Sequence, residues 1–117
     1  MYAFSELLKE IRHETGLTQS AFAEKLNVSA VLIAMLETGQ KEPTKKFIEK
    51  LANKMDVIPQ SIIPFVYNVN KYNEDYMSKL EKDLIKLGMK LQSDLIKKKA
   101  KNILDEKWSI SRYKITK

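Results

Sequence analysis

Apolar residues recur every three or four positions along most of the chain, and turn-forming residues interrupt this pattern. Such spacing places the apolar side chains on one face of a helix, where they can pack into a shared core. The pattern predicts five short helices in the N-terminal half, followed by a much longer one. Counting their capping residues, the short helices are expected over about 3–14, 18–26, 29–38, 44–55 and 59–63.

The predicted helix ends carry residues that favour capping. Thr18, Ser29 and Thr44 stand where a side-chain oxygen can accept a hydrogen bond from a free N–H group of the first turn. Gly16 and Gly39 stand where a chain leaves a helix in the left-handed conformation. The chain has only three Gly and three Pro and is rich in Leu, Ile, Lys and Glu, so these signals together predict an all-α protein.

The long helix is expected over about 73–104, after a connector rich in Asn and Tyr. Its apolar residues alternate by three and four for little more than two heptads, until Asp94 occupies the next such position. An isolated helix of this kind is marginal in water, so its apolar face must pack on something. Two interpretations stay open, namely packing against the N-terminal half of the same chain and dimerisation with a second copy. The residues of this leucine seam are Met77, Leu80, Leu84, Leu87 and Leu91.

The chain therefore divides into three predicted parts, a helical domain at 1–66, the long helix at 67–104 and a basic tail at 105–117. The net charge of +6 is unevenly placed along them. Residues 1–66 and 67–96 each contain equal numbers of basic and acidic side chains, so the whole excess lies in residues 97–117. Such a basic end favours nucleic-acid phosphate, although lysines near the end of a helix are also commonly just solvated.

Catalytic and metal-binding chemistry has little support in the sequence. The chain has no Cys and one His, and it lacks a nucleophile elbow and a Gly-rich phosphate loop. We therefore expect no enzyme activity, no metal and no cofactor. No stretch approaches the roughly 20 apolar residues of a membrane span, and the N-terminus does not resemble a signal peptide. These features predict a cytoplasmic protein without membrane contact.

One segment, LLKEIRHETGLTQSAFAEKLNVSAVLIAMLETGQKEPTKKFIEKLANKMDV, resembles the Cro/C1-type helix-turn-helix family, also called the XRE family. The Gly-Leu-Thr-Gln start of one helix, the Leu-Glu-X-Gly end of the next and the Pro-Thr start of a third occur at the family's spacing. The similarity covers about residues 4–63. It implies a five-helix lambda-repressor-like domain that binds double-stranded DNA, with the helix at 29–38 in the major groove.

The resemblance also implies roles for individual residues. Arg12 and Glu37 match positions that form a largely buried ion pair in some family members, which is a structural role. Gln19 matches a position at a helix N-terminus that often contacts a DNA phosphate or a base. The predicted DNA-contacting residues are Thr18, Gln19, Ser29, Ala30, Val31, Ala34, Met35, Thr38, Gln40, Lys41 and Lys45.

The helix expected to read bases departs from the usual pattern, because it has no Arg, Lys, Asn or Gln between Ser29 and Leu36. Three explanations compete. The helix can read thymine methyl groups through Ala30, Val31 and Met35, which favours A·T-rich sites and leaves part of the specificity to DNA shape. Its apolar face can instead bind a protein. It can also be covered by the chain's own long helix, which would make DNA binding conditional.

The preferred hypothesis is a sequence-specific transcriptional regulator, a dimeric repressor of phage, mobile-element or antitoxin type. A homodimer is expected because a single helix-turn-helix makes few contacts and two-fold symmetric proteins match palindromic operators. A toxin or an antirepressor is a possible protein partner, and a toxin would bind the tail after about Asn102. The alternative is a protein-interaction module that keeps the fold and binds a protein through the helix at 29–38 or the long helix.

Overall fold

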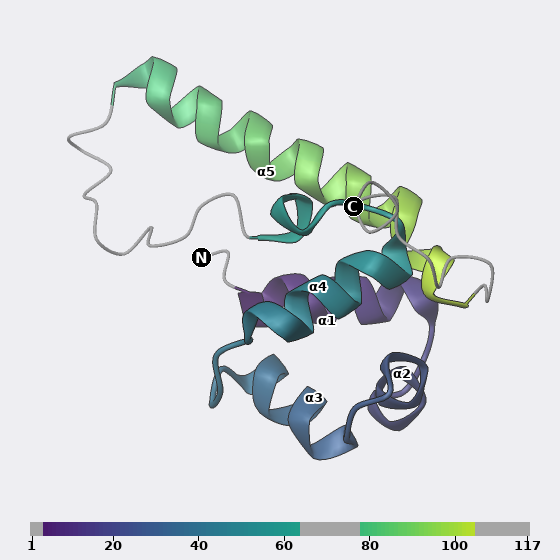
Figure 1. Ribbon diagram of the computed structural model, residues 1–117. Helices are drawn as coiled ribbons and strands as arrows, with labels where there is room; N and C mark the ends of the chain where they lie inside the picture. Colours follow the sequence, from purple (N-terminus) through teal and green to yellow (C-terminus); the bar gives the residue numbers. More distant parts are fainter. Residues whose placement is uncertain (1–3, 64–77, 105–117) are drawn as a thin grey trace.

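The computed structural model describes residues 4–63 and 78–104, and every regular element within these ranges is a helix (Figure 1). The predicted all-α fold is therefore confirmed for this part of the chain, whereas Met77, the connector and the basic tail lie outside it. No helix in the described ranges has the length and apolar character needed to cross a membrane. The elements are α1 (Phe4–Thr15), α2 (Gln19–Leu26), α3 (Ala30–Thr38), α4 (Lys45–Met55), the 3-10 helix η1 (Pro59–Ile62), α5 (Lys79–Lys99) and the 3-10 helix η4 (Ala100–Leu104).

The three predicted N-caps are all formed. Thr18, Ser29 and Thr44 have extended backbone torsions, and each side-chain oxygen accepts a hydrogen bond from the N–H three residues later, at 3.1 Å in every case. These bonds satisfy one of the donors that the start of a helix leaves free. The caps therefore explain why α2, α3 and α4 begin where the sequence predicts.

The helix ends are only partly those expected. Gly16 and Gly39 have φ angles of 74° and 81°, in the left-handed region that glycine adopts without strain. By contrast, α2 and α4 end at Asn27 and Asp56, which have φ angles of 58° and 61°. Asn and Asp enter this region more easily than other side chains do. The short turn between α2 and α3 is thus made without a glycine.

One hydrophobic core joins the N-terminal helices to the end of the long helix. The apolar residues of α1, α2, α3 and α4 meet in this core, and Ile96, Ala100 and Ile103 from α5 and η4 are buried in the same cluster. These three side chains are thereby removed from water together with the apolar residues of the N-terminal helices. The end of the long helix is thus structurally continuous with the helices of the region 1–66.

The long helix presents two different apolar faces. Its packing stripe consists of Ile85, Met89, Gln92 and Ile96, which are buried or half-buried. The four described leucines of the seam are exposed instead. With about 100° between successive residues, the two sets lie on nearly opposite sides of α5. The interpretation in which the seam packs on its own chain is therefore wrong for these four leucines, because the packing stripe makes those contacts.

Two buried or half-buried amides attach the C-terminal end of the chain to the core. Gln92 Nε2 donates hydrogen bonds to the carbonyl oxygens of Ser61 and Ile63, at 3.0 and 2.6 Å. Asn102 Nδ2 donates to the carbonyl oxygen of Met55 at 2.8 Å. These carbonyls lie at the ends of η1 and α4, where acceptors lack partners within the helix. Polar contacts as well as apolar burial thus hold α5 and η4 in place.

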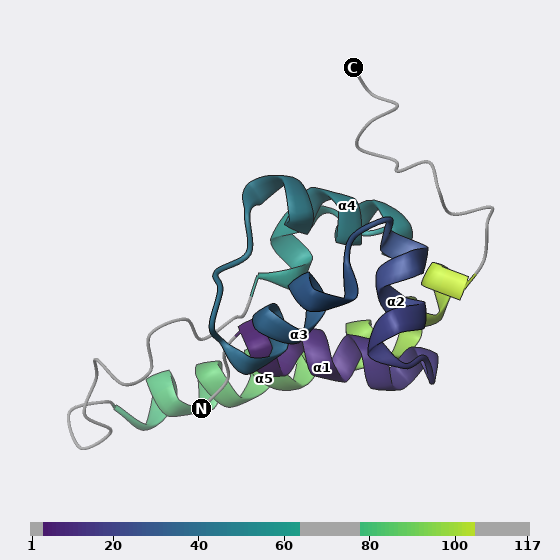
Figure 2. The same ribbon diagram turned by 90° about the horizontal axis from the view of Figure 1, so that it is seen from below.

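The two ribbon views place α3 and α5 on opposite sides of α1. In Figure 1, α5 lies above α1 and α3 lies below it. Figure 2, seen from below, shows α3 in front of α1 and α5 behind it. The N-terminal end of α5 extends past the other helices in both views. The outer side of α3 and the outer side of α5 are therefore separate surfaces.

Candidate nucleic-acid interface

A tight turn joins α2 to α3 and fixes the position of one helix against the other. Asn27 adopts the left-handed conformation, and the N–H of Val28 donates to the carbonyl of Ala23 at 3.0 Å. Ser29 then caps α3, and the side chain of Val28 packs against the core. Two short helices joined by such a turn form a helix-turn-helix unit, in which one face of the second helix is left to solvent.

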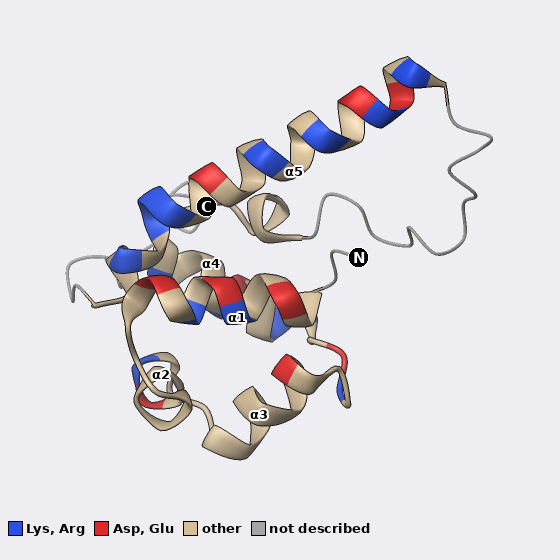
Figure 3. Cartoon of the chain, turned by 180° about the vertical axis from the view of Figure 1, so that it is seen from behind, with Lys and Arg blue, Asp and Glu red and all other residues tan. Residues whose placement is uncertain are grey.

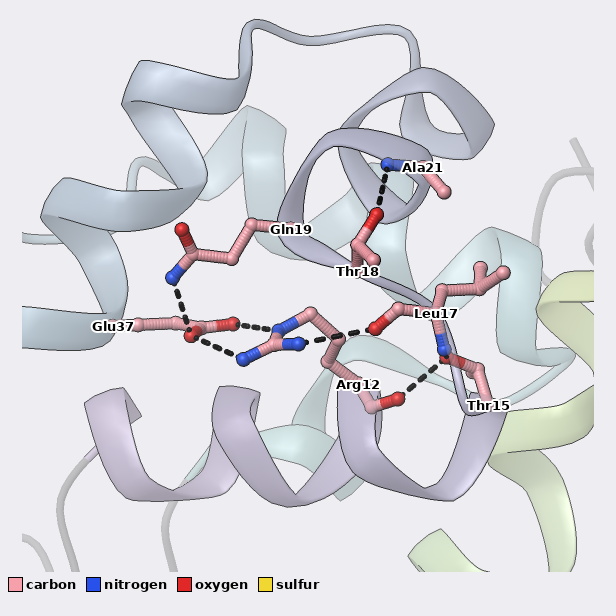
Figure 4. A network of polar contacts seen from close by, with 7 residues as sticks. All are labelled: Arg12, Thr15, Leu17, Thr18, Gln19, Ala21 and Glu37. Carbon is pink, nitrogen blue, oxygen red and sulfur yellow. Dashed lines mark hydrogen bonds and ion pairs between the residues drawn. The ribbon is translucent and has the colours of Figure 1, made fainter.

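A buried carboxylate links α3 to α1 and to the start of α2 (Figure 4). Two guanidinium nitrogens of Arg12 donate to the two carboxylate oxygens of Glu37, at 2.7 and 3.1 Å. Gln19 Nε2 donates to the same carboxylate at 3.0 Å, and Arg12 also donates to the carbonyl of Leu17 at 3.0 Å. The two parallel Arg–carboxylate bonds have the geometry of strong pairs. The ion pair expected between Arg12 and Glu37 is thus present and has additional partners.

The network keeps Glu37 ionised. Burial of the carboxylate opposes ionisation, but the hydrogen bonds from Arg12 and Gln19 and the charge of Arg12 outweigh it and lower the pKa of Glu37. The hydrogen bond to Glu37 in turn raises the pKa of Arg12 above its ordinary value. Both side chains therefore carry their charges at neutral pH, and the pair holds the C-terminal end of α3 against α1.

Gln19 makes a contact that its local sequence does not predict. Its predicted role is a contact with a phosphate or a base, yet its amide nitrogen here binds Glu37, 18 residues away. Nothing in the local pattern signals a bond across that separation. Thr18 and Gln19 still lie at the start of α2, where free N–H groups and the helix dipole favour a phosphate. The DNA contact of Gln19 stays a prediction, and Glu37 restricts the positions that the Gln19 side chain can take.

The outward face of α3 consists of Ala30, Val31, Ala34 and Met35, and it is apolar and open to solvent. Val31 is 66% exposed and Met35 37% exposed, while the two alanines are half-buried beside them. Leu32, at the margin, packs against the core, and so does Ala30, so Val31 and Met35 are the exposed members of this face. Because Val31 and Met35 are exposed, the explanation in which the chain's own long helix covers α3 is wrong for the described residues.

Polar residues predicted to contact phosphate lie at the C-terminal end of α3. Thr38, Gln40, Lys41 and Lys45 are all exposed, in or beside the loop that leads to α4. The Thr38 hydroxyl donates to the carbonyl of Met35 at 3.2 Å, which holds it against the last turn of α3. Whether these four side chains meet DNA stays a prediction. Thr38, Gln40 and Lys41 lie at or directly after the end of α3, whereas Lys45 lines a hollow between α4 and η1 with Ile48 and Pro59.

The ribbon of α3 carries no basic residue (Figure 3). The helix carries no Lys or Arg, and its one acidic residue, Glu37, is the buried one. Lys41 and Lys45 are the predicted phosphate contacts that carry charge, whereas the lysines at 97–101 lie in the last turn of α5 and in η4. A protein with few phosphate contacts gains little sequence-independent affinity. The side chains of α3 itself therefore offer apolar contacts, and the positive charge beside its first turn comes from Lys46 and Lys50, which line a hollow with Val28 and Leu32.

A second group of titratable side chains lies between α1 and α5. Glu6, Glu10, His13 and Lys97 line a hollow there, and Ser93 donates a hydrogen bond to Glu10 at 2.6 Å. In the described ranges, no three His, Asp or Glu residues are grouped so that they could hold a metal ion. The Ser93–Glu10 bond identifies this region as a junction between the two helices.

Comparisons with known proteins agree with this geometry. The helix-turn-helix family model matches residues 8–59. The immunity repressor protein of Bacillus phage phi105 is 31% identical over 90 residues, which cover 77% of this chain and 62% of the relative. The uncharacterized HTH-type transcriptional regulator YqaE of Bacillus subtilis is 37% identical over 54 residues, covering 46% of this chain and 47% of the relative. The chain thus spans less than two thirds of the length of either relative. No solved structure matches it significantly.

Proposed function

We propose that the protein is a sequence-specific DNA-binding transcriptional regulator that acts as a repressor, because the helix-turn-helix family model matches residues 8–59. The similarity to a phage immunity repressor supports repression, and the second relative is named as a transcriptional regulator. The phage repressor also favours a phage-type regulator over an antitoxin. A DNA-binding regulator of this kind works in the cytoplasm.

The observation that carries the proposal is the open outward face of α3. Val31 and Met35 project from the second helix of the helix-turn-helix unit, the helix that enters the major groove in this motif. Apolar side chains at this position contact the methyl group of thymine, which a G·C pair lacks. The protein should therefore prefer A·T-rich operators, with part of its specificity coming from the shape of the DNA.

The surrounding polar residues position this face on the DNA backbone. The free N–H groups at the N-terminus of α2, beside Thr18 and Gln19, bind a phosphate of one DNA strand. The loop after α3, with Gln40 and Lys41, and Lys45 at the start of α4 supply hydrogen bonds and positive charge to another phosphate. Such contacts fix the orientation of the domain and leave base recognition to α3.

The regulator acts as a homodimer through the leucine seam. A single helix-turn-helix unit makes few DNA contacts, and a two-fold symmetric protein carries two such units. The four described leucines of the seam are exposed along α5, so a partner helix can reach them. A second copy is the partner that this function requires.

Substitution of the outward face of α3 tests the proposal. Val31→Asp and Met35→Asp each place a carboxylate against the DNA, and we expect at least about 30-fold weaker specific binding, the effect of losing ~2 kcal/mol at one base contact. Gel-shift titration against the DNA upstream of the protein's own gene measures this change. Ile58→Asp is the matched control, because Ile58 is an exposed aliphatic residue outside α3. Specific binding that survives both α3 substitutions in folded protein contradicts the proposal.

A protein-interaction module on the same fold is the second candidate. The outward face of α3 is apolar and exposed, and exposed apolar patches commonly bind proteins. A toxin or an antirepressor is the class of partner that this candidate function implies. The gel-shift experiment separates the two functions, because an interaction module forms no specific complex with any operator. Val31→Asp would still abolish the binding of its protein partner.

A further inference from the structure

The leucine seam is an apolar surface that the rest of the described chain leaves uncovered. Leu80, Leu84, Leu87 and Leu91 are 79%, 60%, 55% and 58% exposed, although they lie on one side of a single helix. The opposite side of α5 is occupied by the packing stripe, so the helix cannot turn to bury its leucines without losing those contacts. The seam also begins on the end of α5 that extends past the other helices (Figure 1). A second helix can therefore lie along it.

A second copy in antiparallel orientation matches this seam leucine for leucine. In a pair centred between Leu84 and Leu87, Leu84 packs against Leu87 of the second copy, and Leu80 packs against Leu91. The two-fold axis repeats both contacts. A shift of one heptad toward the C-terminus would place Leu84 against Asp94, and the opposite shift would bring the two Asp83 side chains together. Only the central register pairs all four leucines with leucines.

The charges beside the seam are complementary in the same register. Asp83 and Lys90 flank the leucines on one side, and Asp83 of each copy lies next to Lys90 of the other. Within one copy these residues bind Lys79 and Asp94, at 3.1 and 3.0 Å. Such exposed pairs along a helix contribute little, so a change of partner costs little. On the other side of the seam, Gly88 has no side chain and allows close approach.

A parallel pair of the same helices lacks this complementarity. Each seam position would then face the same position of the second copy. Just beyond the leucines, Asp94 would lie against Asp94 and Lys98 against Lys98. Like charges held in direct contact destabilise a helix pair. Asp83 and Lys90 would each lie near an uncharged residue of the second copy and form no ion pair. The distribution of charge along α5 therefore favours the antiparallel arrangement.

We infer that the leucine seam binds a second copy of this chain as an antiparallel helix pair, with Leu84 against Leu87 and Asp83 against Lys90 across the interface. The inference rests on the proposed function, because it specifies how the proposed homodimer is built. The outward face of α3 lies across α1 from α5, so the pair leaves that face free in each copy and directs the two faces to opposite sides of the dimer.

Charge reversal in the full-length protein tests this arrangement. Asp83→Lys turns two attractive contacts into repulsive ones, and we expect the dimer dissociation constant to rise about tenfold. Asp83→Lys combined with Lys90→Asp restores opposite charges across the interface, and dimerisation should return close to that of the wild type. The double variant leaves both intrahelical ion pairs broken, so its recovery comes from contacts between copies. Lys86→Asp, an equal change of charge on another side of α5, is the control and should have little effect.

Sedimentation equilibrium without DNA provides the readout. A wild-type protein that stays monomeric at its highest soluble concentration overturns the inference. A dimer that Asp83→Lys leaves unchanged, or that the double variant does not rescue, also overturns it. Asp94→Cys introduces the chain's only cysteine where a parallel pair would bring two copies together, so a disulfide-linked dimer of this variant overturns it as well. Gel-shift titration of the same samples tests the proposed function separately. A wild-type protein that dimerises but binds no operator contradicts the proposed function, while the dimer itself supports the helix pair.

Discussion

Glu37 determines how α3 is held against the rest of the domain. Its carboxylate is buried and accepts hydrogen bonds from Arg12 and Gln19, which come from α1 and from the start of α2. Replacing a buried ion pair by apolar residues is often neutral, whereas removing one partner leaves an uncompensated charge. The pair therefore does more to fix the orientation of α3 than to increase the net stability. That orientation decides which side chains of α3 face outward.

Removal of one partner from the pair is expected to be costly. Glu37→Leu leaves the Arg12 guanidinium without its carboxylate, and we expect the free energy of unfolding to fall by about 3 kcal/mol. Arg12→Met combined with Glu37→Leu removes both charges and should recover most of this loss. Urea unfolding followed by circular dichroism at neutral pH measures both variants. Equal losses in the single and double variants would show that packing, not the unpaired charge, causes the effect.

The lowered pKa of Glu37 predicts how stability depends on pH. A carboxyl group whose folded pKa lies below its ordinary value of 4.5 stabilises the fold above that value, and the contribution is lost as the pH falls through the lowered pKa. Glu37→Gln removes this titration. We expect the difference in unfolding free energy between wild type and Glu37→Gln to be constant from neutral pH to about pH 5.5 and to shrink in more acidic solution. A difference that is the same throughout a series of urea unfolding experiments down to acid pH argues against an ionised Glu37.

At the scale of elements, the short helices could be predicted because their signals are local. Thr18, Ser29 and Thr44 each act on an N–H group three residues away, so the sequence around each cap contains the whole interaction. The packing of α5 could not be predicted in this way. The helix carries two apolar stripes, and the contact that distinguishes them joins Gln92 to Ser61, 31 residues earlier. Periodicity finds both stripes and gives no reason to choose between them.

The candidate site shows the same division between local and distant contacts. Val31 and Met35 could be placed on the outward face of α3, because Ile33 and Leu36 occupy the inward positions of the same short helix. The bond from Gln19 to Glu37 depends on how two helices are packed, so no local pattern indicates it. Sequence spacing thus identifies the surface of α3 but not the network that holds it.

The attachment of α5 gives a prediction at this scale. Gln92→Ala leaves the carbonyls of Ser61 and Ile63 without this donor, and we expect a loss of about 2 kcal/mol of unfolding free energy. Amide hydrogen exchange in the last turns of α5 should accelerate at the same time, because the helix opens more easily. Lys86→Ala, on the exposed side of α5, is the control and should change neither quantity. Unchanged exchange in Gln92→Ala would mean that the apolar residues alone hold the helix.

At the scale of the whole molecule, the two apolar surfaces of the chain are independent. The outward face of α3 lies on one side of α1, and α5 with its seam lies on the other. The helix-turn-helix core between them includes the end of α5, so the long helix is anchored to the domain while its seam stays free. Side chains that are well separated and share no partners usually act additively. DNA binding and self-association should therefore be separable by mutation.

Two variants should each remove one activity and keep the other. Leu84→Lys with Leu91→Lys places charges in the seam, and we expect a folded monomer that binds a duplex carrying one half-site within about twofold of the wild type. Val31→Asp should stay dimeric and lose binding to the same duplex. Sedimentation equilibrium and fluorescence anisotropy measure the two properties on the same samples, with circular dichroism as a check of folding. If the folded seam variant loses half-site binding, the long helix is coupled to the outward face of α3 through the core, and the two surfaces do not act separately.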